Sequence, residues 1–129
     1  MQQAIPHSDK ERAEQSRRFA IEAARLAAET RGRDVVVLDV SNLSPVTDYY
    51  VIATGTSARQ MRTVVDQVTE MAGERFGIKA LGSSGYEGEQ WILSDYVDVI
   101  VHVFSEEARG FYDLDNLWGD ARKVDWSAA

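Results

Sequence analysis

The sequence predicts a mixed α/β domain of the α+β kind, in which helices flank a mixed β-sheet. Two long segments repeat apolar residues every three or four positions, and short runs rich in Val, Ile and Tyr lie between and after them. The chain has 129 residues, of which 44% are hydrophobic, enough for one core of ordinary size. We therefore expect a single domain over residues 9–119, with a flexible N-terminus over 1–8 and a frayed C-terminal tail over 120–129.

The first helix is predicted to begin after Ser8, because Ser8 and Glu11 have the spacing of a capping box. Its apolar stripe comprises Phe19, Ala20, Ala23, Ala24, Leu26 and Ala27. Gly32 is suited to the left-handed position that follows a last helical turn.

Two predicted strands follow. Residues 35–40 form an apolar run broken only by Asp39, which is typical of a buried strand. Residues 41–47, which include a proline, are predicted to be a loop, and residues 49–54 are the second strand.

The second helix has the clearest amphipathic pattern in the chain. Ser57 and Gln60 form another capping pair, and Gly77 is predicted to end the helix. One side of it carries Met61, Val64, Val65, Val68, Met71, Ala72 and Phe76.

A hairpin is predicted after this helix. Residues 78–81 form a short strand candidate, and 82–88 a flexible loop. Residues 89–94 and 97–104 then pair around a turn at 95–96. Alternation in the last strand assigns Val97, Val99, Val101 and Val103 to the face that meets the helices. The other face, with Asp98, Ile100, His102 and Phe104, is expected to look outward, and Trp91 fits either face.

Ser105 is positioned to cap a last helical region over 106–118, with a break near 112–113. In the tail, Trp126 is a candidate for folding back onto the domain.

Charge and composition restrict the partners. The net charge is −7 and the pI is near 4.8, so we expect little or no direct nucleic-acid binding and attraction to basic proteins. Cysteine is absent, which excludes disulfides. There is no apolar run long enough to span a membrane and no apolar stretch at the N-terminus, so a cytoplasmic protein is expected.

The junction at residues 54–57 is a candidate phosphate site, since a strand there meets a helix N-terminus. It has neither the P-loop nor the dinucleotide-binding pattern, and the strand predicted at 78–81 offers no carboxylates for metal ions. A nucleotide-binding or nucleotidyl-transferring enzyme is therefore the alternative hypothesis. Asp98 and His102 lie ~13 Å apart along a strand, too far to share a metal. We expect no metal, no cofactor and no catalytic residues.

The residues that remain suit a docking surface. Trp91 and Tyr96 supply aromatic contact area, and Asp95 and Asp98 supply negative charge near them. An exposed apolar sheet face also allows the free protein to pair with a second copy, so a homodimer is a further expectation.

The assembled motifs resemble the ribosomal silencing factor family, RsfS, also called Iojap or YbeB. The resemblance covers residues from about 20 to 124. Its markers are Leu38-Asp39-Val40, Asp48-Tyr49-Tyr50-Val51-Ile52-Ala53-Thr54-Gly55, Ser57-x-Arg59-Gln60, Gly85-x-x-x-Glu89-x-Trp91, Asp95-Tyr96-x-Asp98-Val99-x-Val101-His102-x-Phe104, Arg109-x-Phe111-Tyr112 and Leu114-x-x-Leu117-Trp118. Val97 departs from the family, which usually has Gly there, so the turn geometry is expected to differ.

The resemblance implies a nucleotidyltransferase-like fold without catalytic acids. It further implies a protein that binds the large ribosomal subunit through its ribosomal protein number fourteen, blocks association with the small subunit and represses translation. A role in large-subunit maturation is also implied. Carried over by position, Trp91 and Tyr96 should contact the partner, with Asp95 and Asp98 beside them. Weaker candidates for the same surface are Tyr86, Glu87, His102 and Phe104.

Overall fold

A computed structural model describes residues 9–127. Its elements in chain order are α1 (Asp9–Glu29), β1 (Arg33–Asp39), β2 (Tyr49–Thr54), α2 (Ala58–Phe76), β3 (Gly82–Ser84), β4 (Trp91–Asp95), β5 (Val99–Phe104), α3 (Glu106–Tyr112), α4 (Leu114–Leu117) and β6 (Arg122–Val124). The first eight residues, including Ser8 and the N-terminus predicted to be flexible, lie outside the described residues.

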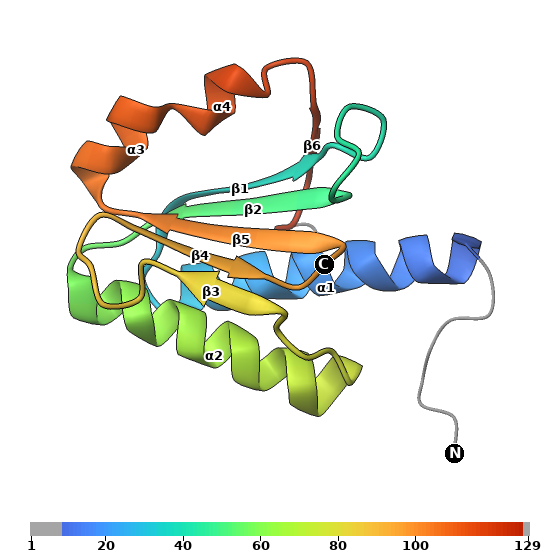
Figure 1. Cartoon of the computed structure of the whole chain (residues 1–129), viewed down its shortest axis with the longest axis horizontal. Helices are drawn as coiled ribbons and strands as arrows, with labels where there is room; N and C mark the ends of the chain where they lie inside the picture. Colours follow the sequence, from blue (N-terminus) through green and yellow to red (C-terminus); the bar gives the residue numbers. More distant parts are fainter. Residues whose placement is uncertain (1–8, 128–129) are drawn as a thin grey trace.

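The strands form one six-stranded sheet in the order β3-β4-β5-β2-β1-β6 (Figure 1). β2 pairs with β5 in parallel, and the other neighbouring strands pair antiparallel. The parallel pair requires a crossover, which α2 begins and the β3–β4 hairpin completes. The predicted class, a mixed sheet with flanking helices, is confirmed.

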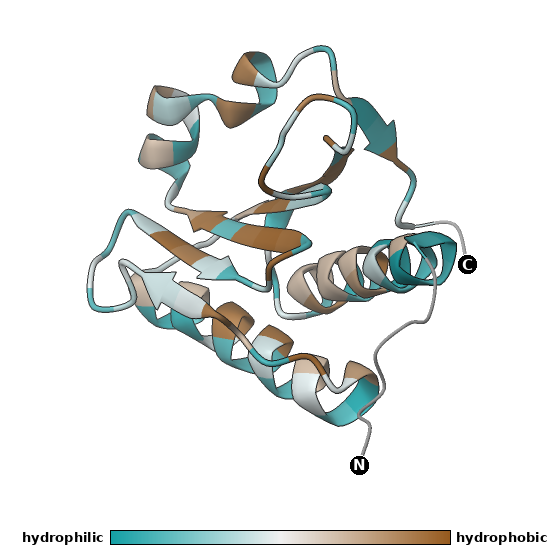
Figure 2. Ribbon diagram, turned by 45° about the vertical axis from the view of Figure 1, so that its right-hand side comes forward, coloured by the Kyte–Doolittle hydropathy of each residue, from teal (hydrophilic) through white to brown (hydrophobic). Residues whose placement is uncertain are grey.

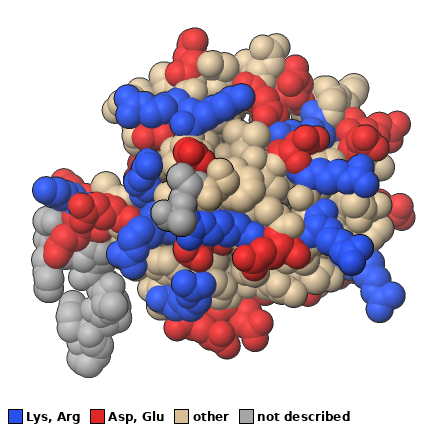
Figure 3. Space-filling model, turned by 180° about the vertical axis from the view of Figure 1, so that it is seen from behind, with Lys and Arg blue, Asp and Glu red and all other residues tan. Residues whose placement is uncertain are grey.

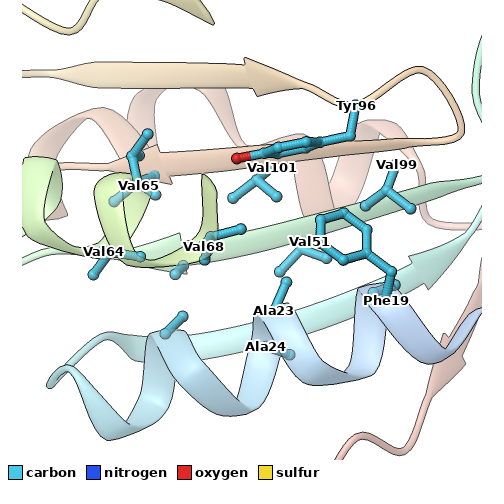
Figure 4. Close-up of a cluster of buried hydrophobic side chains, with 14 of the residues drawn as sticks. Phe19, Ala23, Ala24, Val51, Val64, Val65, Val68, Tyr96, Val99 and Val101 are labelled. Atoms are coloured by element: carbon cyan, nitrogen blue, oxygen red, sulfur yellow. The ribbon is translucent and has the colours of Figure 1, made fainter. Parts of the chain in front are cut away.

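α1 and α2 lie side by side across one face of the sheet (Figure 1). Their apolar stripes meet the alternate residues of the central strands, and Val51, Val64, Val68 and Phe19 are fully buried there (Figure 4). In Figure 2 the hydrophobic colour follows the central strands and the sides of these helices that meet the sheet, whereas β3 is pale and β6 is mostly hydrophilic. No helix in residues 9–127 is long and apolar enough to cross a membrane.

Local signals predicted the ends of α2 correctly. The Ser57 hydroxyl accepts a hydrogen bond from the Gln60 N–H at 3.1 Å, as an N-cap residue does. Gly77 ends the helix with φ 65°, the left-handed conformation expected of glycine at this position.

The end of α1 differs from the prediction. Arg31, with φ 72°, occupies the left-handed position that was assigned to Gly32. A Cβ atom on Gly32 would lie 2.7 Å from the carbonyl oxygen of Ala27. Glycine is therefore required at position 32 because the backbone of α1 passes so close to it.

The strand predicted at residues 78–81 is absent, and β3 forms instead in the segment predicted to be a loop. Ile78 and Ala80 pack against the core without joining the sheet, whereas Gly82–Ser84 pairs with β4. Gly and Ser have low intrinsic strand preference, so pairing with β4 overrides local propensity here.

The described part of the C-terminal tail, residues 120–127, is not frayed as predicted. Arg122–Val124 forms β6 and pairs with β1, on the edge of the sheet opposite β3. The Trp126 indole N–H donates a hydrogen bond to the Val35 carbonyl at 2.9 Å, so the predicted fold-back of this residue is confirmed.

The last helical region is broken where the sequence indicated. Ser105 caps α3 by accepting a hydrogen bond from the Ala108 N–H. Asp113, with φ 49°, separates α3 from α4. The two short helices lie over the face of the sheet opposite α1 and α2 (Figure 1), which we call the outer face.

Candidate protein-binding surface

Alternate side chains of β4 and β5 point toward the outer face. Register pairs Trp91 with Phe104 and Leu93 with His102, and all four lie on the side away from α1. Ile92 and Val103, one residue along each strand, point into the core under α1 and α2.

The outer face is covered more fully than the sequence analysis expected. Phe104 is 0% exposed and His102 is 4% exposed, because α3 and α4 fold back across β5 and β2 and form a second, smaller core. The expectation that these two side chains look outward is therefore wrong. Alternation along β5 assigns a face correctly, but it does not reveal whether a later segment covers that face.

Trp91 remains partly exposed at the margin of this cover. Its ring centroid lies 4.9 Å from that of Phe104 and 4.7 Å from that of Tyr112 on α3. The Trp91 Nε1–H donates a hydrogen bond to Nδ1 of His102 at 3.0 Å. The indole is thus fixed by two rings and one polar contact, and part of it is open to a partner.

Two exposed aromatic side chains of α3 continue this surface. Phe111 is 79% exposed and Tyr112 is 47% exposed, and their ring centroids are 5.0 Å apart. With Trp91 they form a contiguous group that we call the aromatic surface. Phe111 and Tyr112 were not among the predicted site residues, although the marker Arg109-x-Phe111-Tyr112 contains both.

Tyr96 lies on the opposite side of the sheet from Trp91, so its predicted place on the docking surface is wrong. It is 4% exposed, its ring centroid lies 5.1 Å from that of Phe19, and its hydroxyl is 2.7 Å from Thr69 Oγ1 (Figure 4). Burial raises the pKa of this phenol. Counting alternate residues from Trp91 along β4 would have placed Tyr96 on the helix-covered face.

Asp98 is held by α1. Arg12 donates to its two carboxylate oxygens at 2.7 and 2.9 Å, and the Ser16 hydroxyl lies 3.3 Å from one of them. Asp98 was predicted to share a face with His102, but Asp98 precedes β5 and its side chain turns toward α1. Its carboxylate anchors α1 to the β4–β5 turn.

The other acidic and aromatic candidates are dispersed. The Tyr86 hydroxyl donates to Asp66 on α2, and this hydrogen bond raises the pKa of Tyr86. Glu87 is exposed in the β3–β4 loop, and Asp95 is partly exposed, accepting a hydrogen bond from the Val97 N–H at 2.8 Å. Only Trp91 of the eight predicted residues belongs to the aromatic surface.

His102 is the electrostatically unusual residue of the outer face. Burial lowers its pKa from 6.5 to about 4, so the ring is neutral near pH 7. Because Nδ1 accepts from Trp91, the proton resides on Nε2. That buried atom has no hydrogen-bond partner among the described residues.

At the strand–helix junction Thr54–Ser57, two backbone N–H groups already have acceptors within the protein. The Gly55 N–H donates to the Phe104 carbonyl and the Thr56 N–H donates to the Gln60 side chain. A Cβ atom at Gly55 would lie 2.2 Å from Met61 Cγ, so packing explains this glycine. The adjoining hollow is lined by Glu89 and Glu106 and by one basic residue, Arg33, so its charged side chains are acidic on balance and would oppose an anion. In the described part of the chain, no three His, Cys, Asp or Glu residues are grouped to hold a metal ion.

Known proteins resemble this chain along most of its length. The profile of a family described as "Ribosomal silencing factor during starvation", RsfS, matches residues 13–129. Ribosomal silencing factor RsfS of Bacillus subtilis is 36% identical over 103 residues, which cover 80% of this chain and 86% of that protein. The chloroplastic protein Iojap of Arabidopsis thaliana is 31% identical over 107 residues, which cover 83% of this chain and 44% of Iojap.

Solved structures have the same architecture. A crystal structure of a Chromobacterium violaceum protein matches with a TM-score of 0.73 and 33% identity, covering 90% of this chain and 92% of that one. A protein from Bacillus halodurans matches with a TM-score of 0.70 and 29% identity, covering 87% of this chain and 98% of that one.

Proposed function

We propose, given that the chain belongs to the RsfS family of ribosomal silencing factors, that it binds the large ribosomal subunit through ribosomal protein number fourteen. The bound protein sterically blocks association with the small subunit and represses translation, and it makes and breaks no covalent bonds. The family match over residues 13–129 is the observation that carries this proposal. The same contact is compatible with a role in large-subunit maturation in the cytoplasm.

The aromatic surface is the docking site in this proposal. Aromatic side chains that are already held by neighbouring rings lose little conformational freedom on binding and supply large contact areas. Phe111 and Tyr112 are exposed, and Trp91 lies beside them, so a partner can cover all three at once. No rearrangement of the sheet is needed for this contact.

Charge supports a basic partner such as a ribosomal protein. The net charge of −7 favours encounter with a basic surface and disfavours direct contact with RNA. In the view of Figure 3, Lys and Arg side chains are interspersed with Asp and Glu side chains, and the basic ones form no continuous patch. Attraction to the protein component of the subunit is therefore favoured over attraction to its RNA.

Two matched substitutions test the docking site. Phe111→Asp places a charge in the aromatic surface, whereas Leu81→Asp places the same charge at an equally exposed apolar residue next to β3. We expect Phe111→Asp to weaken co-sedimentation with purified large subunits by tenfold or more, on the order of the effect of a truncated interface anchor. Leu81→Asp should bind like the wild type, and circular dichroism should be native for both.

The repressing activity itself is tested by measuring the association of large and small subunits with light scattering. Added wild-type protein should slow the association of large and small subunits, and Phe111→Asp should not. A wild-type protein that neither sediments with large subunits nor slows joining refutes the function. Equal binding by Phe111→Asp and wild type, with loss in Leu81→Asp, would instead move the docking site to the β3 edge.

The free protein is also proposed to form a homodimer through the aromatic surface, because an exposed apolar group can pair with itself when its partner is absent. Such a dimer would compete with ribosome binding. Sedimentation equilibrium of wild type and Phe111→Asp should therefore show weaker self-association in the variant.

A further inference from the structure

His102 lies at the centre of the outer face, and aromatic rings surround it. Its ring centroid lies 5.0 Å from that of Tyr50, 6.0 Å from that of Phe104 and 5.7 Å from that of Trp91. The residue is 4% exposed, so a docking partner cannot reach its side chain directly. Any part that His102 takes in binding must therefore act through a neighbour.

Trp91 is that neighbour. Ring contacts with Phe104 and Tyr112 confine the indole, but such contacts tolerate rotation within the ring plane. The hydrogen bond from Trp91 Nε1 to His102 Nδ1, at 3.0 Å, is directional and selects one orientation. It therefore determines which edge of the indole remains available at the surface.

Histidine is a poor choice for packing alone at this position. Accepting from Trp91 leaves the Nε2–H of His102 buried without a partner among residues 9–127. A buried, unsatisfied donor opposes folding. A phenylalanine would fill the same space between rings without that donor, and the indole N–H of the partly exposed Trp91 would then have to hydrogen-bond to water. Stability alone does not explain why the chain has an acceptor here.

We propose that His102 is a positioning residue, which holds the Trp91 indole in the orientation that the aromatic surface needs to bind its protein partner. This inference rests on the proposed function. It predicts that binding affinity and stability change in opposite directions. His102 aids binding through its hydrogen bond with Trp91, while its buried, unpartnered Nε2–H opposes folding.

Two substitutions with opposite properties test the inference. His102→Phe keeps a ring and removes both the acceptor and the unpartnered donor. We expect its melting temperature to equal or exceed that of the wild type, while its affinity for large subunits falls about tenfold, the effect of losing one hydrogen bond. His102→Asn loses the ring but keeps an oxygen near the position of Nδ1. It should melt lower than His102→Phe yet bind more tightly.

The orientation of Trp91 can be followed without any partner. In a nitrogen–proton correlation spectrum, the Trp91 indole signal is identified as the one missing from Trp91→Phe. We expect this signal to move upfield in His102→Phe, as a donor that loses its acceptor does, and to stay near its wild-type position in His102→Asn. The indole signals of Trp118 and Trp126 serve as internal controls.

The outcomes separate this inference from the proposed function. If the wild type binds large subunits and His102→Phe binds equally well, the positioning role is wrong and the function stands. The same holds if the Trp91 indole signal does not move in His102→Phe. If the wild type does not bind, the proposed function fails, and the inference fails with it.

Discussion

Val97 has a backbone conformation that is unfavourable for a branched side chain. Its φ of 76° is in the left-handed region, which favours glycine, and its side chain is well exposed. A non-glycine residue in this region costs about 1–2 kcal/mol, and glycine loses roughly 0.5–1 kcal/mol through its greater freedom when unfolded. Val97→Gly should therefore raise the free energy of unfolding by up to about 1 kcal/mol, measured by urea denaturation.

Val97→Ala is the control for that prediction. It removes the branch but keeps the Cβ atom, so most of the unfavourable conformation persists and the gain should be smaller. A Val97→Gly variant that is clearly less stable than wild type would show that the valine side chain contributes packing that outweighs its backbone conformation.

Gly85 holds the chain close to Trp91. It has φ 79°, and a Cβ atom there would lie 2.0 Å from the carbonyl oxygen of Trp91. Backbone cannot move away as a flexible side chain can, so Gly85→Ala should destabilise the protein by more than about 2 kcal/mol in thermal or urea unfolding. This requirement gives a physical reason for the motif Gly85-x-x-x-Glu89-x-Trp91.

Gly73, in the interior of α2, provides the matched substitution. It has no atoms within 4 Å of an added Cβ, so Gly73→Ala should stabilise the helix by roughly 0.5–1 kcal/mol. If both alanine variants changed stability in the same direction, the close approach at Gly85 would not be the cause.

Besides apolar packing, the side chain of Arg109 links the α3–α4 unit to the sheet. Arg109 donates to both carboxylate oxygens of Asp115 at 2.9 and 3.0 Å and to Thr54 Oγ1 at 2.8 Å, and its side chain is 13% exposed. The hydrogen bond from Arg109 lowers the pKa of Asp115. Three elements, β2, α3 and α4, are thereby joined behind the aromatic surface.

Removing this arginine should therefore loosen the surface. Arg109→Met leaves the Asp115 carboxylate and the buried Thr54 hydroxyl without their partner, so we expect a loss of about 2 kcal/mol in unfolding free energy. Arg75→Met, which breaks the exposed pair with Glu22, should lose less than about 1 kcal/mol. Equal losses in the two variants would contradict the distinction between a largely buried and an exposed arginine.

Element by element, the sequence predicted what local chemistry determines. The ends of α2, the strand at Tyr49–Thr54 and the Ser105 cap depend on neighbouring residues and were predicted correctly. β3 and β6 were not predicted. β3, a Gly-Ser-Ser segment, forms by pairing with β4, and β6 forms by pairing with β1, which is far from it in sequence. Of the aromatic surface, only Trp91 was predicted. His102 and Phe104 were predicted to be exposed, but α3 and α4 bury them, and this packing depends on the tertiary fold.

At the scale of the whole molecule, stability depends on pH through one buried histidine. His102 is neutral in the folded protein and titrates at about 4, whereas its ordinary pKa is 6.5. A lowered pKa means that the unfolded chain binds the proton first, so stability is lost as the pH falls from about 6.5 to about 4. The loss should be on the order of 3 kcal/mol, and it acts on the outer-face core that α3 and α4 complete.

A second loss follows at lower pH. The pKa of Asp115 is lowered from 3.8, so the stability contributed by its contact with Arg109 is present above that value and disappears as the carboxylate is protonated below it. Asp48 acts in the opposite direction. Burial raises its pKa, and protonation removes the free-energy cost of keeping a charged carboxylate partly buried. The Asp115 effect belongs to a more acidic range than the imidazole effect.

Urea denaturation between pH 7.5 and pH 4.5 distinguishes these contributions. The wild type should lose stability steadily below pH 6.5, and His102→Phe should have a much flatter profile over the same range, because the group that the unfolded chain would protonate is absent. A wild-type profile as flat as that of His102→Phe would show that the imidazole is protonated as easily in the folded protein as in the unfolded chain. The tight aromatic enclosure of His102 argues against that result, since an imidazolium ion there would be buried among Tyr50, Trp91 and Phe104 without a counter-charge in contact.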